Sequence, residues 1–357
     1  MRDARHVLFL ALLVQVPACS MGQKPAQNTA QNTAQNAAPP EKQPATPAKP
    51  VASCSRTDPY DATAMQADVA YLADPSLDGR VPGSAGGDLA IEYIRERFEC
   101  LGLARLGNMT TYVQPFTDPT QRKTANIVAV VPGSDPAVAS EYVVVTAHHD
   151  HFGGGKLGAN DNASGIAGLL AIAQALKQGA APRRSVVLLA AGSEEPPHES
   201  EDLEFANGTR YLRQHPPTGF DPTNVVYNVN MDMIGTYGAD SDGSLSILGA
   251  FPDTYGKTAV QTVKALAAHA SLTLVDLGKD SDQSDNVVFC EEGVPYLFAW
   301  TEDPQCYHKP CDNAAHIDSS GMSRVARFVG DLTLDIANTT TDLEAGVKVG
   351  QNVCLVP

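Results

Sequence analysis

The sequence predicts an α/β fold in which helices flank both faces of a central, mostly parallel or mixed β-sheet. Strand-like and helix-like segments alternate from Cys54 onward, as in sheets whose strands are joined by helical connections. Several strand-like runs are apolar at every position, which indicates strands buried on both faces. The chain has 357 residues, 43% of them apolar, so it can enclose one large core, and we expect a single domain over residues 54–357.

Helical spacing of apolar residues appears in five segments. In residues 87–101, for example, Ile91, Ile94 and Phe98 fall on one stripe. The predicted helices are 62–73, 87–101, 163–178, 256–270 and 321–337. Apolar or alternating runs predict strands at 126–131, 142–147, 186–191, 225–231, 245–248 and 294–300. Their order in the sheet is not readable from the sequence.

Residues 1–18 are predicted to be an export signal peptide. Two arginines precede the apolar run 7–14, which is too short to span a bilayer. The string VPAC is similar to the bacterial lipoprotein box, in which the cysteine, here Cys19, becomes the lipidated first residue of the mature chain. We expect an exported protein, periplasmic or at the cell surface, with a lipid anchor in the outer membrane. Ordinary secretion with cleavage nearby is the alternative.

Composition separates a tether from the domain. Residues 19–53 are rich in Gln, Asn, Ala and Pro and contain no aromatic residue, so they cannot bury enough apolar surface to fold and are predicted to be disordered.

The formal charge of −16 argues against binding of nucleic acid or of an anionic membrane through a basic face. Membrane contact is therefore expected only through the anchor at Cys19.

Cysteine usage agrees with export. Apart from Cys19 there are six cysteines, an even number that suits an oxidising compartment. Cys306 and Cys311 are close enough to close one short loop in PQCYHKPCD, and we predict that they form a disulfide. The sequence does not select among the other pairings.

Polar residues with metal-binding chemistry follow the predicted strands. In AHHDH (147–151), His148 and Asp150 are two apart and so point to the same face. A metal-bound histidine usually gives its other ring N–H to an acceptor, and Asp150 is placed to orient His148 in this way. For His149 and His151 a structural role is expected.

The turn and the strands that follow add carboxylates. Asp161, in GANDNASG (158–165), lies ten residues beyond His151, where a carboxylate could bridge two metals, although a capped helix start is the alternative. Glu194 and Glu195 follow the strand 186–191. Adjacent buried acids are costly without a cation, whereas with one present a glutamate can ligate while its neighbour accepts a proton.

Two later segments complete the set. Asp232 follows the strand 225–231 and is either a helix cap or a ligand. Tyr307 and His308 lie between the two cysteines of PQCYHKPCD, and a rigid loop favours positioned chemistry over a mobile surface segment.

These motifs, AHHDH, NDNASG, SEE, NVNMDMIG and CYHKPCD in that order, resemble those of the M28 family of zinc peptidases. The resemblance covers most of residues 60–340. It implies a zinc-peptidase architecture of the phosphorylase/hydrolase-like type, with the catalytic domain over residues 54–357. It also implies an aminopeptidase that acts on peptides with a free N-terminus.

Position by position, the resemblance implies a site with two zinc ions. Glu194 would be the general base, Asp150 would orient His148, and Tyr307 would donate a hydrogen bond to the developing oxyanion. The implied metal ligands are His148 and Asp232 for one zinc, Glu195 and His308 for the other, and Asp161 as the bridge.

The sequence departs from the family pattern in two places. An acidic segment, 196–212, follows SEE; we expect a solvated charge run, while selection of basic substrates or an extra cation site are alternatives. Where relatives often read SDHxxF, this chain reads SDNVVF (284–289) and has Asn286 at the histidine position.

Three other functions are compatible with these motifs. A glutaminyl cyclase of the same fold would use one zinc and need not keep the bridging set. A carboxypeptidase-like relative would need basic pocket residues, which the sequence does not locate. A non-catalytic surface binding lipoprotein would be expected to lose ligands or the base. The complete series of ligands favours hydrolysis.

Overall fold

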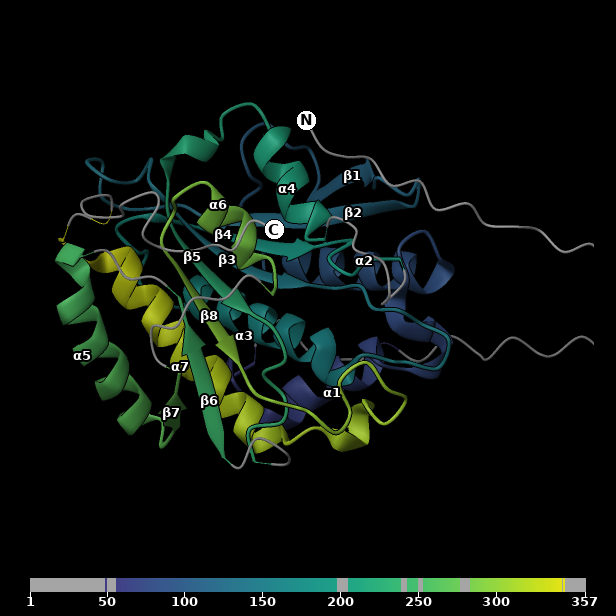
Figure 1. The fold of residues 1–357 in the computed structure, drawn as a ribbon. Coiled ribbons are helices and arrows are strands. Elements are labelled where there is room, and N and C mark those ends of the chain that lie inside the picture. Colours follow the sequence, from purple (N-terminus) through teal and green to yellow (C-terminus); the bar gives the residue numbers. More distant parts are fainter. Residues whose placement is uncertain are drawn as a thin grey trace, which may run out of the picture. The chain divides into compact units, whose positions relative to one another are not determined.

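The four strands at the centre of the sheet run parallel to one another (Figure 1). This computed structural model describes residues 49, 56–197, 205–238, 243–249, 253–276, 283–341 and 343. Within that part of the chain the sheet has eight strands, in the order β1-β2-β4-β3-β5-β8-β6-β7. The central strands are β4 (Ser185–Ala191), β3 (Tyr142–His148), β5 (Val225–Met231) and β8 (Tyr296–Trp300).

Strands of mixed direction extend the sheet at both sides. On one side β2 (Lys123–Val131) pairs antiparallel with β4, and β1 (Val113–Thr117) pairs antiparallel with β2. On the other side β6 (Ser244–Leu248) pairs antiparallel with β8, and β7 (Thr273–Val275) runs parallel to β6. The sheet is therefore mixed, with a parallel centre.

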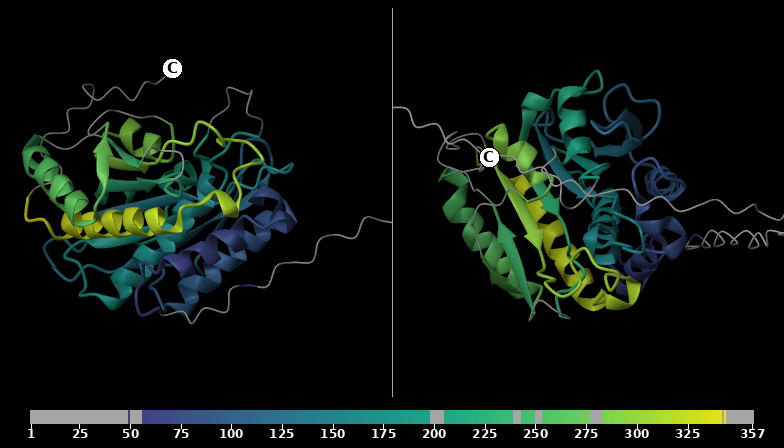
Figure 2. Two further views of the ribbon diagram at one scale, coloured as in Figure 1. Left: turned by 90° about the horizontal axis from the view of Figure 1, so that it is seen from below. Right: turned by 45° about the vertical axis from the view of Figure 1, so that its right-hand side comes forward.

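Helices cover both faces (Figures 1 and 2). One face packs against α1 (Ala62–Leu72), α2 (Ala85–Cys100), α3 (Gly165–Gln178), α5 (Asp253–His269) and α7 (Ser319–Asn338). The other face packs against α4 (Asn207–Gln214) and α6 (Asn286–Glu291). Alternate residues of one strand serve the two cores: Val143 and Val145 face the larger helix layer, whereas Val144 packs with Leu212 and Phe289.

Polar residues fix where the helices begin. The side chain of Asp61 accepts a hydrogen bond from the amide of Ala64 at the start of α1, and Ser84 does the same for Gly87 at the start of α2. Asp318 accepts from the amide of Gly321 at the start of α7. These side chains satisfy amides that have no partner within the helix.

The predicted fold class is confirmed, and each predicted helix and strand is present with ends shifted by a few residues. Four short elements of three to eight residues each were not predicted: β1, β7, α4 and α6. The predicted signal peptide (1–18), the tether (19–53) and Cys19 lie outside the described residues, apart from residue 49. No helix in the described part of the chain is long and apolar enough to cross a membrane.

Candidate metal centre

The residues that the sequence analysis selected for chemistry meet at one edge of the sheet. Parallel strands end at the same edge, which is where open α/β sheets place their sites. The central strands and the residues at their ends are β3 with His148, β4 with Glu194 and Glu195, β5 with Asp232, and β8 with the loop that carries Tyr307 and His308.

Asp161 reaches the same edge from the turn Ala159–Ser164 (η2), which directly precedes α3. The side-chain oxygen of Asn162 accepts hydrogen bonds from the amides of Gly165 (2.9 Å) and Met233 (3.2 Å). This turn is therefore tied both to the start of α3 and to the chain leaving β5. The peptide bond between Asp161 and Asn162 is cis.

Three side chains form a first candidate metal position. The Nε2 atom of His148 lies 3.4 Å from Oδ1 of Asp161 and 3.3 Å from Oδ1 of Asp232. All three residues are buried. We call this group the first position.

A second position lies on the other side of Asp161. The Nε2 atom of His308 lies 3.1 Å from Oδ2 of Asp161 and 3.4 Å from Oε1 of Glu195. Each oxygen of the Asp161 carboxylate thus faces a different imidazole. A carboxylate in this arrangement could bridge two metal ions.

The spacing of these donor atoms fits metal ions. Bonds from zinc to nitrogen or oxygen are about 2.0–2.1 Å long, so neighbouring ligand atoms around a tetrahedral ion lie about 3.3 Å apart. The distances within the two positions, 3.1–3.4 Å, agree with that value. Several buried carboxylates also gather here, which is costly unless cations compensate their charge.

The charges in the cluster shift one another's pKa. Burial disfavours the charged form of His148, but the carboxylates of Asp232 and Glu194 outweigh this effect and raise its pKa well above the usual value. Burial also opposes charge on His308, yet hydrogen bonds with Asp161 and Glu195 raise its pKa to about 10. A metal must displace protons from both rings, so metal affinity is expected to fall in acid.

Glu194 has the environment of a proton acceptor. Burial raises its pKa well above the usual value, and the neighbouring charge of Glu195 adds to the shift although His148 opposes it. Neither metal position includes Glu194, and its side chain lines the adjoining cavity. A carboxylate with a raised pKa is suited to general base chemistry near neutral pH.

Asp150 acts differently from the sequence-based expectation. Its carboxylate accepts hydrogen bonds from the amides of Glu194 (3.0 Å) and Glu195 (3.2 Å). The Nδ1 atom of His148 instead faces the backbone carbonyl oxygen of Asp150, at 3.2 Å. The ring is thus oriented by the main chain, while the carboxylate holds the two glutamates, because the side chain of Asp150 extends toward β4.

Tyr307 lines the cavity next to His308 of the second position. Its ring stacks on that of His308 with 3.7 Å between ring centroids, and the residue is 49% exposed. Partial desolvation and the charge of Asp161 raise the pKa of its hydroxyl, which therefore stays protonated at neutral pH and able to donate a hydrogen bond.

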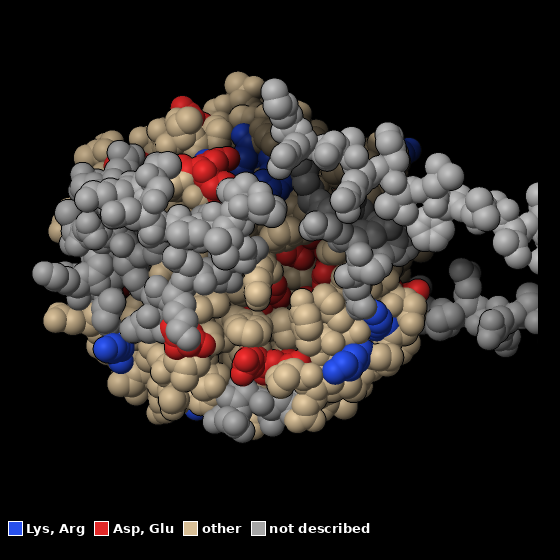
Figure 3. Space-filling view, viewed as in Figure 1, with Lys and Arg blue, Asp and Glu red and all other residues tan. Residues whose placement is uncertain are grey.

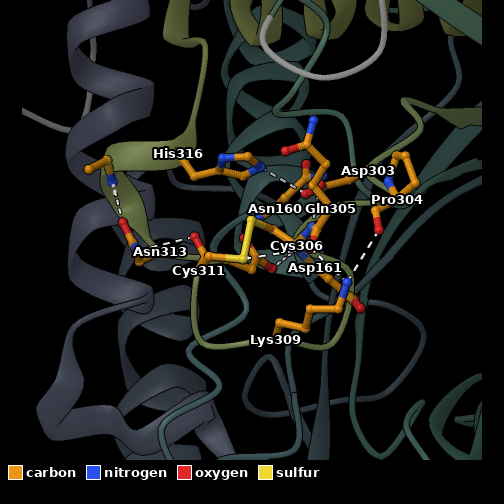
Figure 4. Close-up of a disulfide and its surroundings, with 12 residues drawn as sticks. Asn160, Asp161, Asp303, Pro304, Gln305, Cys306, Lys309, Cys311, Asn313 and His316 are labelled. Carbon is orange, nitrogen blue, oxygen red and sulfur yellow. Dashed lines mark hydrogen bonds and ion pairs between the residues drawn. A yellow bond between two sulfur atoms is a disulfide. The ribbon is translucent and has the colours of Figure 1, made fainter.

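The predicted disulfide between Cys306 and Cys311 is confirmed, with 5.3 Å between the Cα atoms (Figure 4). The loop it closes carries Tyr307 and His308. Lys309, in the same loop, donates a hydrogen bond to the carbonyl of Gln305 at 2.7 Å. Beyond it, the carboxylate of Asp312 accepts hydrogen bonds from the amides of Asn160 (2.6 Å) and Asp161 (3.1 Å).

Cys306 also lies close to Asp303 and His316, a group of residue types that can bind a metal. His316 already pairs with Asp303 through Nε2 at 3.0 Å, and the sulfur of Cys306 is bonded to Cys311. This group lacks a free thiolate and serves to hold the loop (Figure 4).

Arg80, in the LDGR segment, was not predicted to support the site. Its side chain is fully buried and donates hydrogen bonds of 2.6–2.8 Å to four carbonyl oxygens, those of Leu72, His149, Leu157 and Gly158. Burial lowers its pKa to about 10, and nearby carboxylates such as Asp312 oppose the shift. One arginine therefore holds the backbone near both ends of the segment that joins His148 to Asp161.

The two remaining histidines of AHHDH have different surroundings. His149 packs away from the site and its Nε2 lies 2.9 Å from the carbonyl oxygen of Ala125, which agrees with the structural role expected for it. His151 lies within the cluster, because its Nδ1 is 3.1 Å from Oε1 of Glu195. The expectation of a structural role for His151 does not account for this contact.

A cavity of about 630 Å³ opens beside the cluster. Figure 3 shows acidic side chains recessed in a hollow of this face. The lining combines carboxylates with a set of large apolar residues: Phe152, Phe205, Met233, Phe298 and Trp300. No lysine or arginine belongs to the lining among the residues that the structure describes.

Asn286, at the position where relatives often have histidine, is buried and does not line the cavity. Its side-chain oxygen lies 3.4 Å from the side-chain nitrogen of Asn230. Of the acidic segment 196–212, residues 198–204 lie outside the described residues, so its expected solvated character stays a prediction.

Comparison with known proteins relates residues 126–333, more than half of the chain, to the model of peptidase family M28. A relative in Escherichia coli (strain K12), the uncharacterized protein YfbL, is 27% identical over 268 residues, which cover 66% of this chain and 76% of the relative.

Two solved structures of similar fold illustrate the structural similarity. The zinc aminopeptidase BSAP from Bacillus subtilis is 16% identical, with a TM-score of 0.61 over 80% of this chain and 97% of that one. The glutaminyl cyclase of Porphyromonas gingivalis is 20% identical, with a TM-score of 0.60 over 77% and 98%. At this level of identity the similarity establishes the fold and leaves the reaction open.

Proposed function

Because the chain belongs to peptidase family M28, we propose that it is a di-zinc aminopeptidase, which hydrolyses the first peptide bond of peptides with a free N-terminus. The observation that carries the proposal is the orientation of Asp161. Its Oδ1 faces His148 and its Oδ2 faces His308, at 3.4 and 3.1 Å. A carboxylate placed between two donor groups supports two metal ions rather than one.

The proposed mechanism assigns a task to each side chain. Zinc ions held at the two positions would polarise the scissile carbonyl and lower the pKa of a bound water. Glu194 accepts the proton of that water and returns it to the leaving amine, a task suited to its raised pKa. Tyr307 donates a hydrogen bond to the oxygen that becomes negative in the tetrahedral transition state.

Charge in the cavity supports an aminopeptidase over a carboxypeptidase. The terminal amine of a peptide is a cation near neutral pH, and the lining offers it the carboxylate of Glu302. A terminal carboxylate would need a cation, and none of the described lining residues is a lysine or arginine. The acidic lining therefore favours binding of the amino end.

Glutaminyl cyclase is the second candidate, because solved cyclases share the fold. A cyclase with one zinc would have no need for a second donor group. This chain has both groups, with Asp161 between them, and the base Glu194 beside them. Hydrolysis uses all of these residues.

We also propose that the protein is exported and held at the outer membrane by a lipid on Cys19. The disulfide between Cys306 and Cys311 suits an oxidising compartment. Labelling with a fatty acid tests the anchor: incorporation that is lost in Cys19→Ala is expected, and an unlabelled wild-type protein would contradict it.

Matched peptides test the activity. One sequence with an N-terminal phenylalanine is offered in three forms: free at both ends, N-acetylated, and C-terminally amidated. The proposal expects release of phenylalanine from the free and amidated forms, sensitive to a chelator, and none from the acetylated form. Cleavage that requires a free C-terminus would indicate a carboxypeptidase. Loss of ammonia from an N-terminal glutamine peptide without hydrolysis would indicate a cyclase.

A further inference from the structure

His151 brings a third imidazole to the metal centre. The residue begins the loop that follows β3 and is 1% exposed. Its Nδ1 lies 3.1 Å from Oε1 of Glu195 and 3.7 Å from Oδ2 of Asp161. These are the two oxygen atoms that the Nε2 of His308 also faces, at 3.4 and 3.1 Å. Both rings therefore point a nitrogen at the second position.

The ring of His151 is held in this orientation by its packing. Gly158 approaches it so closely that a Cβ on Gly158 would lie 2.6 Å from Cγ of His151, and the backbone of Gly158 has a φ of +62°. Nε2 of His151 makes no hydrogen bond within the described structure. The polar contacts of this buried ring are therefore those of Nδ1, and they are made with the metal-binding carboxylates.

We propose that His151 is a fourth protein ligand of the second position, bound through Nδ1, together with His308, Glu195 and Asp161. This inference rests on the proposed di-zinc site. The separations of Nδ1 from the two oxygens, 3.1 and 3.7 Å, bracket the roughly 3.3 Å edge of a tetrahedral zinc site. The neutral ring adds a ligand without adding charge.

The proposal makes the two positions unequal. The first position has three protein ligands, His148, Asp232 and Asp161, and stays open to water and substrate, as catalytic zinc sites do. The second position would have four protein ligands, as closed structural sites do. We therefore expect the second position to bind zinc more tightly and to fill first. The first position should release and rebind zinc more readily.

A hydrogen bond from Nδ1 to Glu195 is the competing role for His151. Asparagine separates the two roles, because its amide group occupies nearly the place of Nδ1 and can donate to Glu195 but is a poor ligand for zinc. In His151→Asn a role in positioning would survive, whereas a role as ligand would be lost.

Zinc competition with a chromophoric chelator measures this difference in the full-length protein. His151→Asn is expected to weaken the tighter of the two sites by more than about 100-fold, beyond the roughly 10- to 100-fold that loss of an outer hydrogen bond costs. His149→Gln is the matched control, since His149 is an equally buried neighbour outside both positions; its zinc affinity should stay within about threefold. An affinity in His151→Asn within about threefold of wild type would overturn the proposal.

X-ray absorption gives a second readout that needs no variant. Wild-type protein loaded with one zinc per chain should show two imidazole ligands, from His151 and His308. One imidazole would overturn the proposal. Because neither measurement follows hydrolysis, two imidazoles in a protein that cleaves no peptide would refute the proposed function and leave this inference standing.

Discussion

The carboxylate of Asp312 accepts a hydrogen bond from the backbone amide of Asp161, at 3.1 Å. A second bond, 2.6 Å long, comes from the amide of Asn160. Asp312 directly follows Cys311, so the end of the disulfide loop holds the backbone of the bridging residue. The loop that supplies His308 to one metal position thus also positions the carboxylate that both positions share.

Replacing Asp312 by alanine should weaken metal binding. The change leaves two buried amides without an acceptor, at a cost of about 1–3 kcal/mol in the free energy of unfolding of the metal-free protein. Zinc affinity should fall by about 10- to 100-fold, as for loss of other groups that orient ligands. Denaturant unfolding and zinc competition measure these effects. Wild-type affinity in Asp312→Ala would show that the contact does not position Asp161.

Glu194→Gln should remove turnover while keeping the metals. Glutamine has nearly the size of glutamate but cannot accept the proton, so kcat should fall by about 10²- to 10⁴-fold. Neither metal position includes Glu194, so the zinc content should equal that of wild type. Parallel kinetics and elemental analysis check both values. A variant that loses zinc along with activity would make Glu194 a ligand instead.

Tyr307→Phe should lower kcat with little change in KM. The hydroxyl is proposed to act on charge that develops only in the transition state, and loss of one such donor costs about 10²- to 10³-fold in kcat. The ring that stacks on His308 is kept, so the second position should be unaffected. A rise in KM at constant kcat would assign Tyr307 to substrate binding.

Asp118 connects β1 and β2 to the segment that carries the two glutamates. Its carboxylate accepts hydrogen bonds from the hydroxyl of Ser193 (2.8 Å) and from Arg122. Burial would raise its pKa, but these bonds and one from the amide of Arg122 outweigh burial and lower it. The stabilisation is therefore fully present above the unfolded pKa of about 3.9 and is lost as the pH falls through the folded value.

Asp118→Asn should accordingly reduce the free energy of unfolding by about 1–3 kcal/mol at pH 7, and the difference from wild type should shrink below about pH 4. Denaturant titrations of both proteins across this range check the trend. A difference that grows in acid would show that the pKa of Asp118 is raised by folding.

Much of the fold follows from local patterns. The long helices and the central strands are marked by apolar periodicity over many residues, as at Ile91, Ile94 and Phe98 of α2. β7 has three residues and α6 has six, too few to show a period. β7 pairs with β6 at the edge of the sheet, and α6 packs against the sheet through Phe289. Helix α4 follows residues of acidic, turn-like composition, so the sequence does not show where the helix begins.

The candidate site was predictable where a polar residue follows a strand, as for His148, Glu195 and Asp232. Contacts that join distant segments left no local signal. Arg80 bonds to the carbonyl of His149, 69 residues away, and Asp312 bonds to the amide of Asp161, 151 residues away. Asp150 and His151 could be recognised in the sequence as possible site residues. Their partners could not, because the contacts are made with Glu194 and Glu195, which follow a different strand.

Stepwise addition of zinc to the metal-free protein, with release of the N-terminal residue followed at each step, tests the di-zinc aminopeptidase most directly. The account predicts a rate that continues to rise until two zinc ions are bound per chain and that a chelator abolishes. Saturation at one zinc per chain, or no release of the terminal residue at any zinc content, would contradict it.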